Sequence, residues 1–176
     1  LHEHMALLEL TDPVTSLPNR KRLEMMAGQL VKRPGYPWAA IMLNIDHFRE
    51  LNDALGHEAA DRLLMTIGLA LRGKIRKSCH AGRLGGKQFL VLCSNSPHDA
   101  TMAVAERVRS VIAELPVRLP DGSRWQLTAS VGVACSPGDG RSTAELFTAA
   151  ARRADAAKAA GRNCVVGDDH SLRRAS

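Results

Sequence analysis

The segment PWAAIMLNID, residues 37–46, constrains the fold more than any other part of this 176-residue sequence. Its apolar run is continuous and lacks the alternation of polar and apolar residues that is typical of a strand with one face in water. It therefore predicts a central strand that is buried on both faces. A strand of this kind needs other elements packed above and below it.

The rest of the sequence predicts helices and strands that can cover this strand. Ser142 and Glu145 in the stretch STAE have the spacing of a capping box, which predicts the start of a helix, and Gly161 follows its end. Apolar residues recur at helical spacing in three further segments. The predicted helices cover residues 17–33, 60–75, 98–115 and 142–160.

The stretch RLGGKQFLVL, residues 83–92, predicts a β-hairpin with a tight turn at Gly85 and Gly86. Helices interspersed with a central antiparallel hairpin indicate an α+β fold, in which helices flank one mixed sheet. We find no internal repeat and no linker, so one domain is expected. Besides residues 37–46, the predicted strands are 80–84, 89–94, 124–135 and 164–166.

Composition narrows the class of ligand and the cellular setting. The formal net charge of +6 permits anion binding, but three Phe, two Trp and one Tyr are too few for a nucleic-acid stacking platform. Small anions such as nucleotides fit better. No apolar run reaches the length of a membrane span, so no membrane insertion is expected. The four cysteines have no disulfide or metal-ligand spacing, which favours a reduced, cytoplasmic setting; they are Cys79, Cys93, Cys135 and Cys164.

Five sequence blocks occur in an order and spacing that resembles the GGDEF domains. This family includes the diguanylate cyclases, which condense two GTP molecules into cyclic di-GMP. The resemblance implies a nucleotidyl-cyclase-like, ferredoxin-like palm over residues 12–167, with the end of an upstream signalling helix at 1–11 and a tail toward a further domain at 168–176. The blocks are DPVTSLPNR (12–20), NIDHFRELNDALGHEAAD (44–61), RLGGKQF (83–89), SVGVA (130–134) and AKAAGRN (157–163).

The resemblance also implies a guanine nucleotide site. The family's guanine-binding pair falls on Asn52 and Asp61, where a carboxylate can accept both N–H donors of guanine and an amide can donate and accept. Local roles are the alternative. Asn52 could cap a turn, and Asp61 could lie in the first turn of a helix, where negative charge is favoured. Lys158 and Arg162 could stabilise a helix C-terminus by their charge alone. The predicted nucleotide-binding residues are Asn52, Asp61, Gly85, Gly86, Lys87, Lys158 and Arg162.

The residues at the family's metal-binding positions differ from those of active members. The first metal-binding Asp falls on Asn44, and the two acids of the signature loop fall on Lys87 and Gln88. Asp46 is retained, but its implied role at the metal is less direct. Mg²⁺ prefers carboxylate oxygens, and a lysine 4 Å away would cost roughly 8 kcal/mol at an effective dielectric constant near 20. The sequence therefore predicts a degenerate site with no catalytic residues, no Mg²⁺ and no other cofactor.

The family's product-inhibition motif, R-x-x-D, is also altered. Its arginine is retained as Arg76, but Cys79 stands in place of the aspartate that would accept hydrogen bonds from guanine. Weak or absent binding of cyclic di-GMP is expected there. The alternative is that Arg76 belongs to an ordinary basic helix end.

These features predict a regulatory module of a cyclic di-GMP signalling protein. In this interpretation GTP is an effector, and its binding controls an attached output domain such as an EAL cyclic di-GMP phosphodiesterase. Two alternatives remain open: an active diguanylate cyclase, and a dimerisation scaffold that binds nothing. The expected partners are a guanine nucleotide, sensor and output domains in the same chain, and a second copy of the chain.

Overall fold

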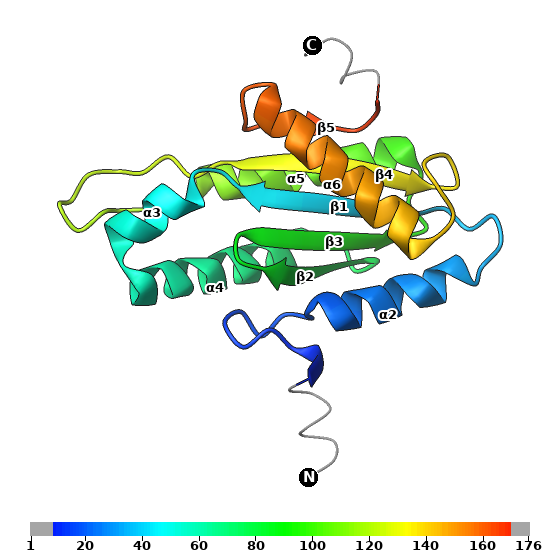
Figure 1. Ribbon diagram of the computed structural model, residues 1–176, viewed down its shortest axis with the longest axis horizontal. Coiled ribbons are helices and arrows are strands. Elements are labelled where there is room, and N and C mark those ends of the chain that lie inside the picture. Colours follow the sequence, from blue (N-terminus) through cyan, green and yellow to red (C-terminus); the bar gives the residue numbers. More distant parts are fainter. Residues whose placement is uncertain (1–8, 170–176) are drawn as a thin grey trace.

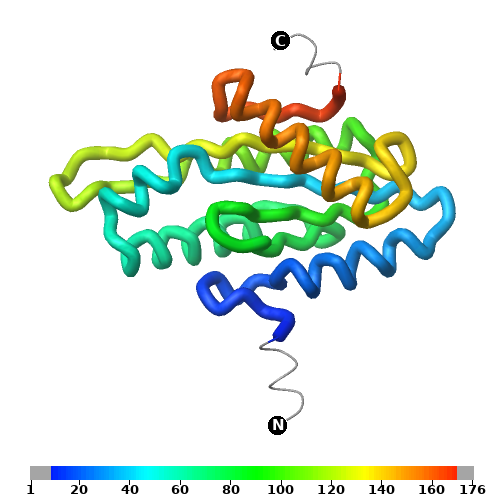
Figure 2. The backbone as a smooth tube through the Cα atoms, viewed as in Figure 1, coloured from blue at the N-terminus to red at the C-terminus, as the bar shows by residue number. Residues whose placement is uncertain are grey.

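The computed structural model describes residues 9–169 (Figure 1). Helices and strands alternate along most of the chain, and the tube in Figure 2 follows them from one end to the other. No helix in this part of the chain is long and apolar enough to cross a bilayer. The elements are α2 (Arg20–Val31), β1 (Trp38–Ile45), α3 (Phe48–Leu55), α4 (His57–Lys74), β2 (Cys79–Gly85), β3 (Gln88–Ser94), α5 (His98–Glu114), β4 (Ala129–Ser136), α6 (Thr143–Ala159) and β5 (Val165–Val166).

The strands form one mixed sheet of five strands in the order β2-β3-β1-β4-β5. The pairs β2–β3, β3–β1 and β1–β4 are antiparallel, and β4–β5 is parallel. All eight residues of β1 are buried, so the prediction of a central strand covered on both faces is confirmed. The α+β fold with helices around a mixed sheet is confirmed as well.

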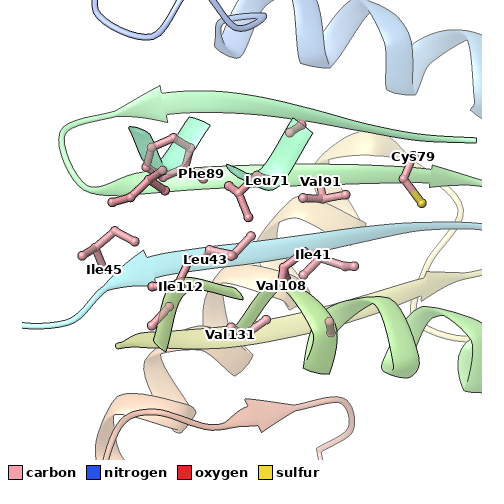
Figure 3. Close-up of a cluster of buried hydrophobic side chains, with 14 of the residues drawn as sticks. Ile41, Leu43, Ile45, Leu71, Cys79, Phe89, Val91, Val108, Ile112 and Val131 are labelled. Carbon is pink, nitrogen blue, oxygen red and sulfur yellow. The ribbon is translucent and has the colours of Figure 1, made fainter. Parts of the chain in front are cut away.

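Alternate residues of β1 enter two separate hydrophobic cores. Ile41, Leu43 and Ile45 pack with side chains of α4 and α5, as Figure 3 shows for this face. Ala40 and Met42 point the other way and pack with α2 and α6. Burying a side chain of this size contributes about 1.5–3 kcal/mol, so the two-sided burial of β1 stabilises the centre of the sheet.

Helix α6 lies directly on β4, in front of the sheet in Figure 1. A Cβ atom at Gly132 would lie 2.0 Å from the carbonyl oxygen of Ala150 and 2.3 Å from the amide nitrogen of Ala154. Glycine is required here because any side chain would push the helix away from the sheet. The close contact fixes where the C-terminal end of α6 lies relative to the end of β1.

Two elements differ from the predictions. Helix α3 was not expected, since it has only eight residues and only Leu51 of them is buried. The strand predicted from residue 124 begins at Ala129, because the residues before it fold into a small hairpin of their own. In that hairpin Arg118 bridges Arg124, and the Trp125 amide donates to the Val117 carbonyl at 3.0 Å.

The predicted segments at the two ends of the chain fall mostly outside the described residues. This holds for residues 1–8 of the predicted upstream helix and residues 170–176 of the predicted tail. Asp169, at the start of that tail, accepts hydrogen bonds from Arg152 and Arg153 of α6. The packed domain therefore extends at least to residue 169.

Candidate functional site

A pocket of about 260 Å³ lies where the end of β1, the β2–β3 turn and the end of α6 meet. The chain leaves β1 at Ile45 and enters α3 at Phe48, and this connection forms one wall. The opposite walls come from the hairpin and from the residues at and after the C-terminus of α6. The lining residues are Ile45, Asp46, His47, Phe48, Arg49, Glu50, Lys87, Lys158 and Arg162.

The charges around this pocket are unbalanced. Four cations and two carboxylates line it, which leaves an excess of two positive charges. Within residues 9–169, neither the Lys87 ammonium nor the Arg162 guanidinium makes a hydrogen bond or an ion pair. Lys158 has only a distant partner, Asp155, at 3.9 Å. The donors of these three side chains are therefore free for an anionic ligand such as a phosphate.

Asp46 is not available to a ligand in the same way, although it lines the pocket. It is 3% exposed, and its Oδ1 accepts a hydrogen bond from the Ser130 hydroxyl at 2.7 Å. Its Oδ2 accepts from the Thr128 hydroxyl at 2.7 Å and from the backbone amide of Asn163 at 3.2 Å. Asp46 therefore joins the end of β1 to β4 and to the loop that carries Arg162. It acts as a positioning residue.

Asn44 lies beside the pocket at the end of β1. The strand register places it opposite Gln88 of β3 on one side and Ser130 of β4 on the other. The side chain is 1% exposed, and its Oδ1 has no hydrogen-bond partner. An unsatisfied buried acceptor costs about 1–3 kcal/mol. The structure thus brings Asn44, Gln88 and the neighbouring Lys87 to one edge of the site.

The β2–β3 turn is held by a buried ion pair. Gly85 and Gly86 have φ angles of +130° and +50°, which side-chain-bearing residues rarely adopt. Arg83 donates two hydrogen bonds to the Gly86 carbonyl, at 3.1 and 2.8 Å, and also pairs with Asp12 at 3.0 Å. Asp12 accepts from the backbone and the hydroxyl of Thr15 as well. The turn that carries Lys87 is therefore fixed to the N-terminal loop.

Sequence reasoning assigned no role to Asp12 or Arg83. Both residues lie in sequence blocks that carry the family resemblance. Membership of these blocks was the only sequence signal that could have indicated a role for them. Their contact joins residues that are 71 positions apart, and no local pattern predicts such a pair.

Comparison with known families now identifies the chain. The model of the family described as "Diguanylate cyclase, GGDEF domain" matches residues 9–164. The chain belongs to the GGDEF family.

Several relatives have names that describe an activity. This GGDEF domain is 36% identical over 157 residues to diguanylate cyclase DgcP of Pseudomonas aeruginosa, covering 88% of the chain and 23% of that protein. It is 32% identical over 167 residues to cyclic di-GMP phosphodiesterase NbdA of the same organism, covering 92% of the chain and 21% of that protein. The chain spans between 21% and 44% of the length of the curated relatives compared with it.

The fold agrees with solved structures of the family. The crystal structure of the GGDEF domain of YfiN (TpbB) from P. aeruginosa superposes with a TM-score of 0.80 at 30% identity. That match covers 87% of this chain and 97% of the solved one. The predicted nucleotidyl-cyclase-like arrangement is therefore confirmed.

The predicted guanine-binding residues lie on the helix pair beyond the pocket. Asn52 lies on α3 one turn after Phe48, and Asp61 lies on α4. Both are partly exposed, and the Asp61 Oδ2 is 3.7 Å from the His57 Nε2. Neither Asn52 nor Asp61 lines the pocket, and neither Gly85 nor Gly86 does. Of the predicted nucleotide-binding residues, the structure thus brings Lys87, Lys158 and Arg162 together at the pocket.

The residues of the R-x-x-D motif line a separate pocket of about 460 Å³. Here the Arg76 Nε donates to the Cys79 Sγ at 3.4 Å, so the two predicted positions are in contact. The Cys79 Sγ also lies 2.7 Å from the Cys93 Sγ. The spacing of the cysteines indicated no disulfide, and all four cysteines are free thiols. The contact between Cys79 and Cys93 was not predicted. The hairpin register places them directly opposite each other.

Proposed function

We propose that this GGDEF domain binds a guanine nucleotide without cyclising it, and that it regulates cyclic di-GMP signalling in this way. One observation carries the proposal. Lys87, Lys158 and Arg162 converge on one pocket with their donors free, while both oxygens of the buried carboxylate there, Asp46, already accept hydrogen bonds. The pocket is thus equipped for phosphate binding and poorly equipped for the acid-dependent chemistry of a cyclase.

The start of α3 adds a second feature that suits phosphate. The first N–H groups of a helix have no partner within the helix, and they favour anions. His47, the N-cap of α3, makes no side-chain capping hydrogen bond, and the pocket is lined by His47, Phe48 and Arg49. A phosphate chain lying here would meet this helix start on one side and the lysines and Arg162 on the other.

The residues at the family's metal positions do not fit Mg²⁺. Asn44 is a neutral amide, Lys87 is a cation, and Asp46 is engaged by three donors. Mg²⁺ requires near-octahedral oxygen ligands, usually with one or two carboxylates. Glu50 is the other carboxylate at the pocket, and it lies exposed in the first turn of α3. In residues 9–169, no cluster of three or more His, Cys, Asp or Glu is arranged to hold a metal ion. We infer that Lys87 supplies positive charge to the phosphates instead.

The names of the relatives support the signalling context. One is a diguanylate cyclase and another is a cyclic di-GMP phosphodiesterase, and the chain covers less than a quarter of each. We infer that this domain acts on an attached output domain, such as an EAL phosphodiesterase. GTP would act by binding one conformation of the protein more tightly than another.

Calorimetric titration with GTP tests the proposal, once with Mg²⁺ and once with EDTA. We expect micromolar binding in both buffers and no cyclic di-GMP by chromatography of the products. Formation of cyclic di-GMP with Mg²⁺ or Mn²⁺ would identify an active cyclase. Absence of binding in both buffers would leave a scaffold that binds no nucleotide.

Asp61→Ala tests the guanine assignment separately from the phosphate pocket. Loss of hydrogen bonds to a charged acceptor is worth about 1.5–3 kcal/mol, so we expect GTP affinity to fall about 10- to 100-fold. Asp53→Ala is the matched control, because Asp53 is an exposed carboxylate on α3 next to Asn52. Equal affinities for the two variants would refute the role of Asp61.

A triple variant, Asn44→Asp with Lys87→Asp and Gln88→Glu, tests the metal argument. It restores the acids expected of active family members, so GTP binding should become dependent on Mg²⁺. If GTP binding by the triple variant stays insensitive to EDTA, the missing acids alone do not explain why this domain would differ from active members of the family.

A further inference from the structure

The β2–β3 hairpin carries two cysteines in direct contact. Cys79 begins β2 and Cys93 lies near the end of β3, and the antiparallel register pairs them. Their Sγ atoms are 2.7 Å apart, and both side chains are buried, with residue exposures of 5% and 0%. Figure 3 shows Cys79 at one end of the hydrophobic cluster. The backbone at this end is held in register, since the Ser94 amide donates to the Ser78 carbonyl at 3.0 Å.

The pKa values of the two thiols are shifted in opposite directions. The hydrogen bond between the two sulfurs lowers the pKa of Cys79 in spite of burial, and the Arg76 guanidinium lowers it further. The same hydrogen bond and burial raise the pKa of Cys93. These opposite shifts favour the thiolate on Cys79 rather than on Cys93. The thiolate is the nucleophilic form of cysteine.

Cys79 is reached from a basic pocket. It lines the 460 Å³ pocket together with Arg76, and further cationic or titratable side chains surround it. Positive charge around a cysteine stabilises its thiolate. These additional side chains are Arg22, Arg72, Lys77 and His80.

The other two cysteines lack these features. Cys135 lies on β4, separated from Cys93 by β1, because both are paired with Ala39. Burial raises the pKa of Cys135, and it raises the pKa of Cys164 as well. Among the four cysteines, only Cys79 combines a stabilised thiolate with a partner thiol in contact.

We propose that Cys79 and Cys93 form a reversible disulfide when the chain meets a hydroperoxide. The Cys79 thiolate attacks one peroxide oxygen, the O–O bond breaks, and hydroxide leaves and takes up a proton to form water. Cys79 is thereby oxidised to a sulfenic acid while the peroxide is reduced. The Cys93 sulfur then attacks the Cys79 sulfur, and the S–O bond breaks. The leaving hydroxide takes the proton of Cys93, so two thiols and one hydrogen peroxide give one disulfide and two waters.

Oxidation changes the basic pocket as well as the hairpin. A disulfide sulfur cannot carry the thiolate charge, so oxidation removes the group that can compensate Arg76, whose Nε donates to the Cys79 Sγ in the reduced chain. Oxidation therefore leaves the cations of this pocket without a thiolate partner. The disulfide would also join the two strands at the end of the hairpin away from Lys87, across 14 residues of sequence.

Peptide mapping of the wild-type chain tests this proposal directly. The folded chain is treated with hydrogen peroxide, denatured and alkylated with iodoacetamide, and its peptides are analysed by mass spectrometry. We expect the peptides with Cys79 and Cys93 to be joined and two hydrogen atoms lighter than their sum. The link should disappear with dithiothreitol, while Cys135 and Cys164 should remain alkylated.

Variants identify the role of each sulfur. Cys93→Ser should accumulate a sulfenic acid at Cys79, trapped by dimedone, whereas Cys79→Ser should leave Cys93 unlabelled. Cys135→Ser is the matched control, because it removes a buried cysteine of the same sheet and should form the link as the wild-type chain does. Free alkylation of both Cys79 and Cys93 in oxidised wild-type chain would overturn the proposal. Dimedone on Cys93 instead of Cys79, or a dominant link to Cys164, would overturn it too.

Discussion

The middle and the end of helix α6 hold their cations in opposite ways. Arg153, in the middle, is 3% exposed and donates to the Val133 carbonyl at 2.8 Å. It also donates to Asp139 at 2.9 Å and to Asp169 at 3.2 Å. The hydrogen bond to Asp139 raises the pKa of Arg153, so this buried guanidinium remains charged. Its hydrogen-bonding capacity is used within the domain.

The end of the helix presents cations without such partners. Lys158 and Arg162 line the pocket with Lys87, and the nearest carboxylate to Lys158 belongs to Asp155 at 3.9 Å. A cation whose donors are satisfied inside the protein stabilises the fold, whereas one with free donors at a pocket can meet an anionic ligand. The two regions thus differ in whether the cations are used within the domain or stay available to a ligand, along α6 and just after it.

Arg153→Met should have the largest effect on stability. Removing the buried Arg153 leaves the partly buried Asp139 carboxylate without its cation and the Val133 carbonyl without its donor, which costs up to about 3–5 kcal/mol. We expect a loss of that size in the free energy of unfolding measured with urea. Arg152→Met is the control, because the Arg152 side chain is 51% exposed and pairs with Asp169 at the surface. Such a surface pair contributes less than about 1 kcal/mol. Equal losses of stability in Arg153→Met and Arg152→Met would contradict a structural role that is specific to the buried Arg153.

Arg162→Met and Lys87→Met should affect binding rather than stability. Each removes a cation from the pocket, and we expect GTP affinity to fall about tenfold, equivalent to about 1.4 kcal/mol. The free energy of unfolding should change by no more than about 0.5 kcal/mol, since neither side chain has a partner within residues 9–169. Lys32→Met, at an exposed lysine after α2, should leave both quantities unchanged. A large loss of stability with Arg162→Met would remove the distinction between the two regions.

The smallest expected effect is on how strongly the free energy of unfolding depends on pH in acid, and it involves Asp139, the partner of Arg153. Burial opposes ionisation of Asp139, but the hydrogen bonds from the Arg153 guanidinium and the Cys135 backbone amide, together with the positive charge of Arg153, outweigh burial and lower the pKa of the Asp139 carboxyl. A lowered pKa in the folded state contributes stability above the unfolded value of about 3.8, and this contribution is lost as the pH falls through the folded value.

Urea unfolding at pH 7 and near pH 3 measures this sensitivity. The stability difference between the wild-type chain and Asp139→Asn should be larger at pH 7 and should narrow in acid. The difference between wild type and Arg162→Met should stay small at both pH values. If the stability difference between the wild-type chain and Asp139→Asn is the same at both pH values, Asp139 does not contribute to stability through its charge.

Much of the fold was predictable from local patterns. The unbroken apolar run of residues 37–46 predicted β1, and the helical spacing of apolar residues predicted α2, α4, α5 and α6. The capping pattern at Ser142 was confirmed, since its hydroxyl accepts from the Glu145 amide at 3.1 Å. Helix α3 was missed because a single buried residue produces no apolar stripe.

The candidate site was only partly predictable. The motif blocks predicted that Lys87, Lys158 and Arg162 belong to one site, and the structure brings them to one pocket. The nucleotide-binding roles of Asn52 and Asp61 stay predictions. The contact of Cys79 with Cys93 was not foreseen, because only the register of the hairpin creates it.

The sequence by itself determined the family and, apart from helix α3, the order of the elements. These properties depend on residue type and on neighbours along the chain. The tertiary structure decided that Asp46 is occupied, since its partners Ser130 and Asn163 are 84 and 117 residues away. Contacts over such separations depend on strand register and on how closely α6 lies against the sheet, and neither is encoded in a local pattern.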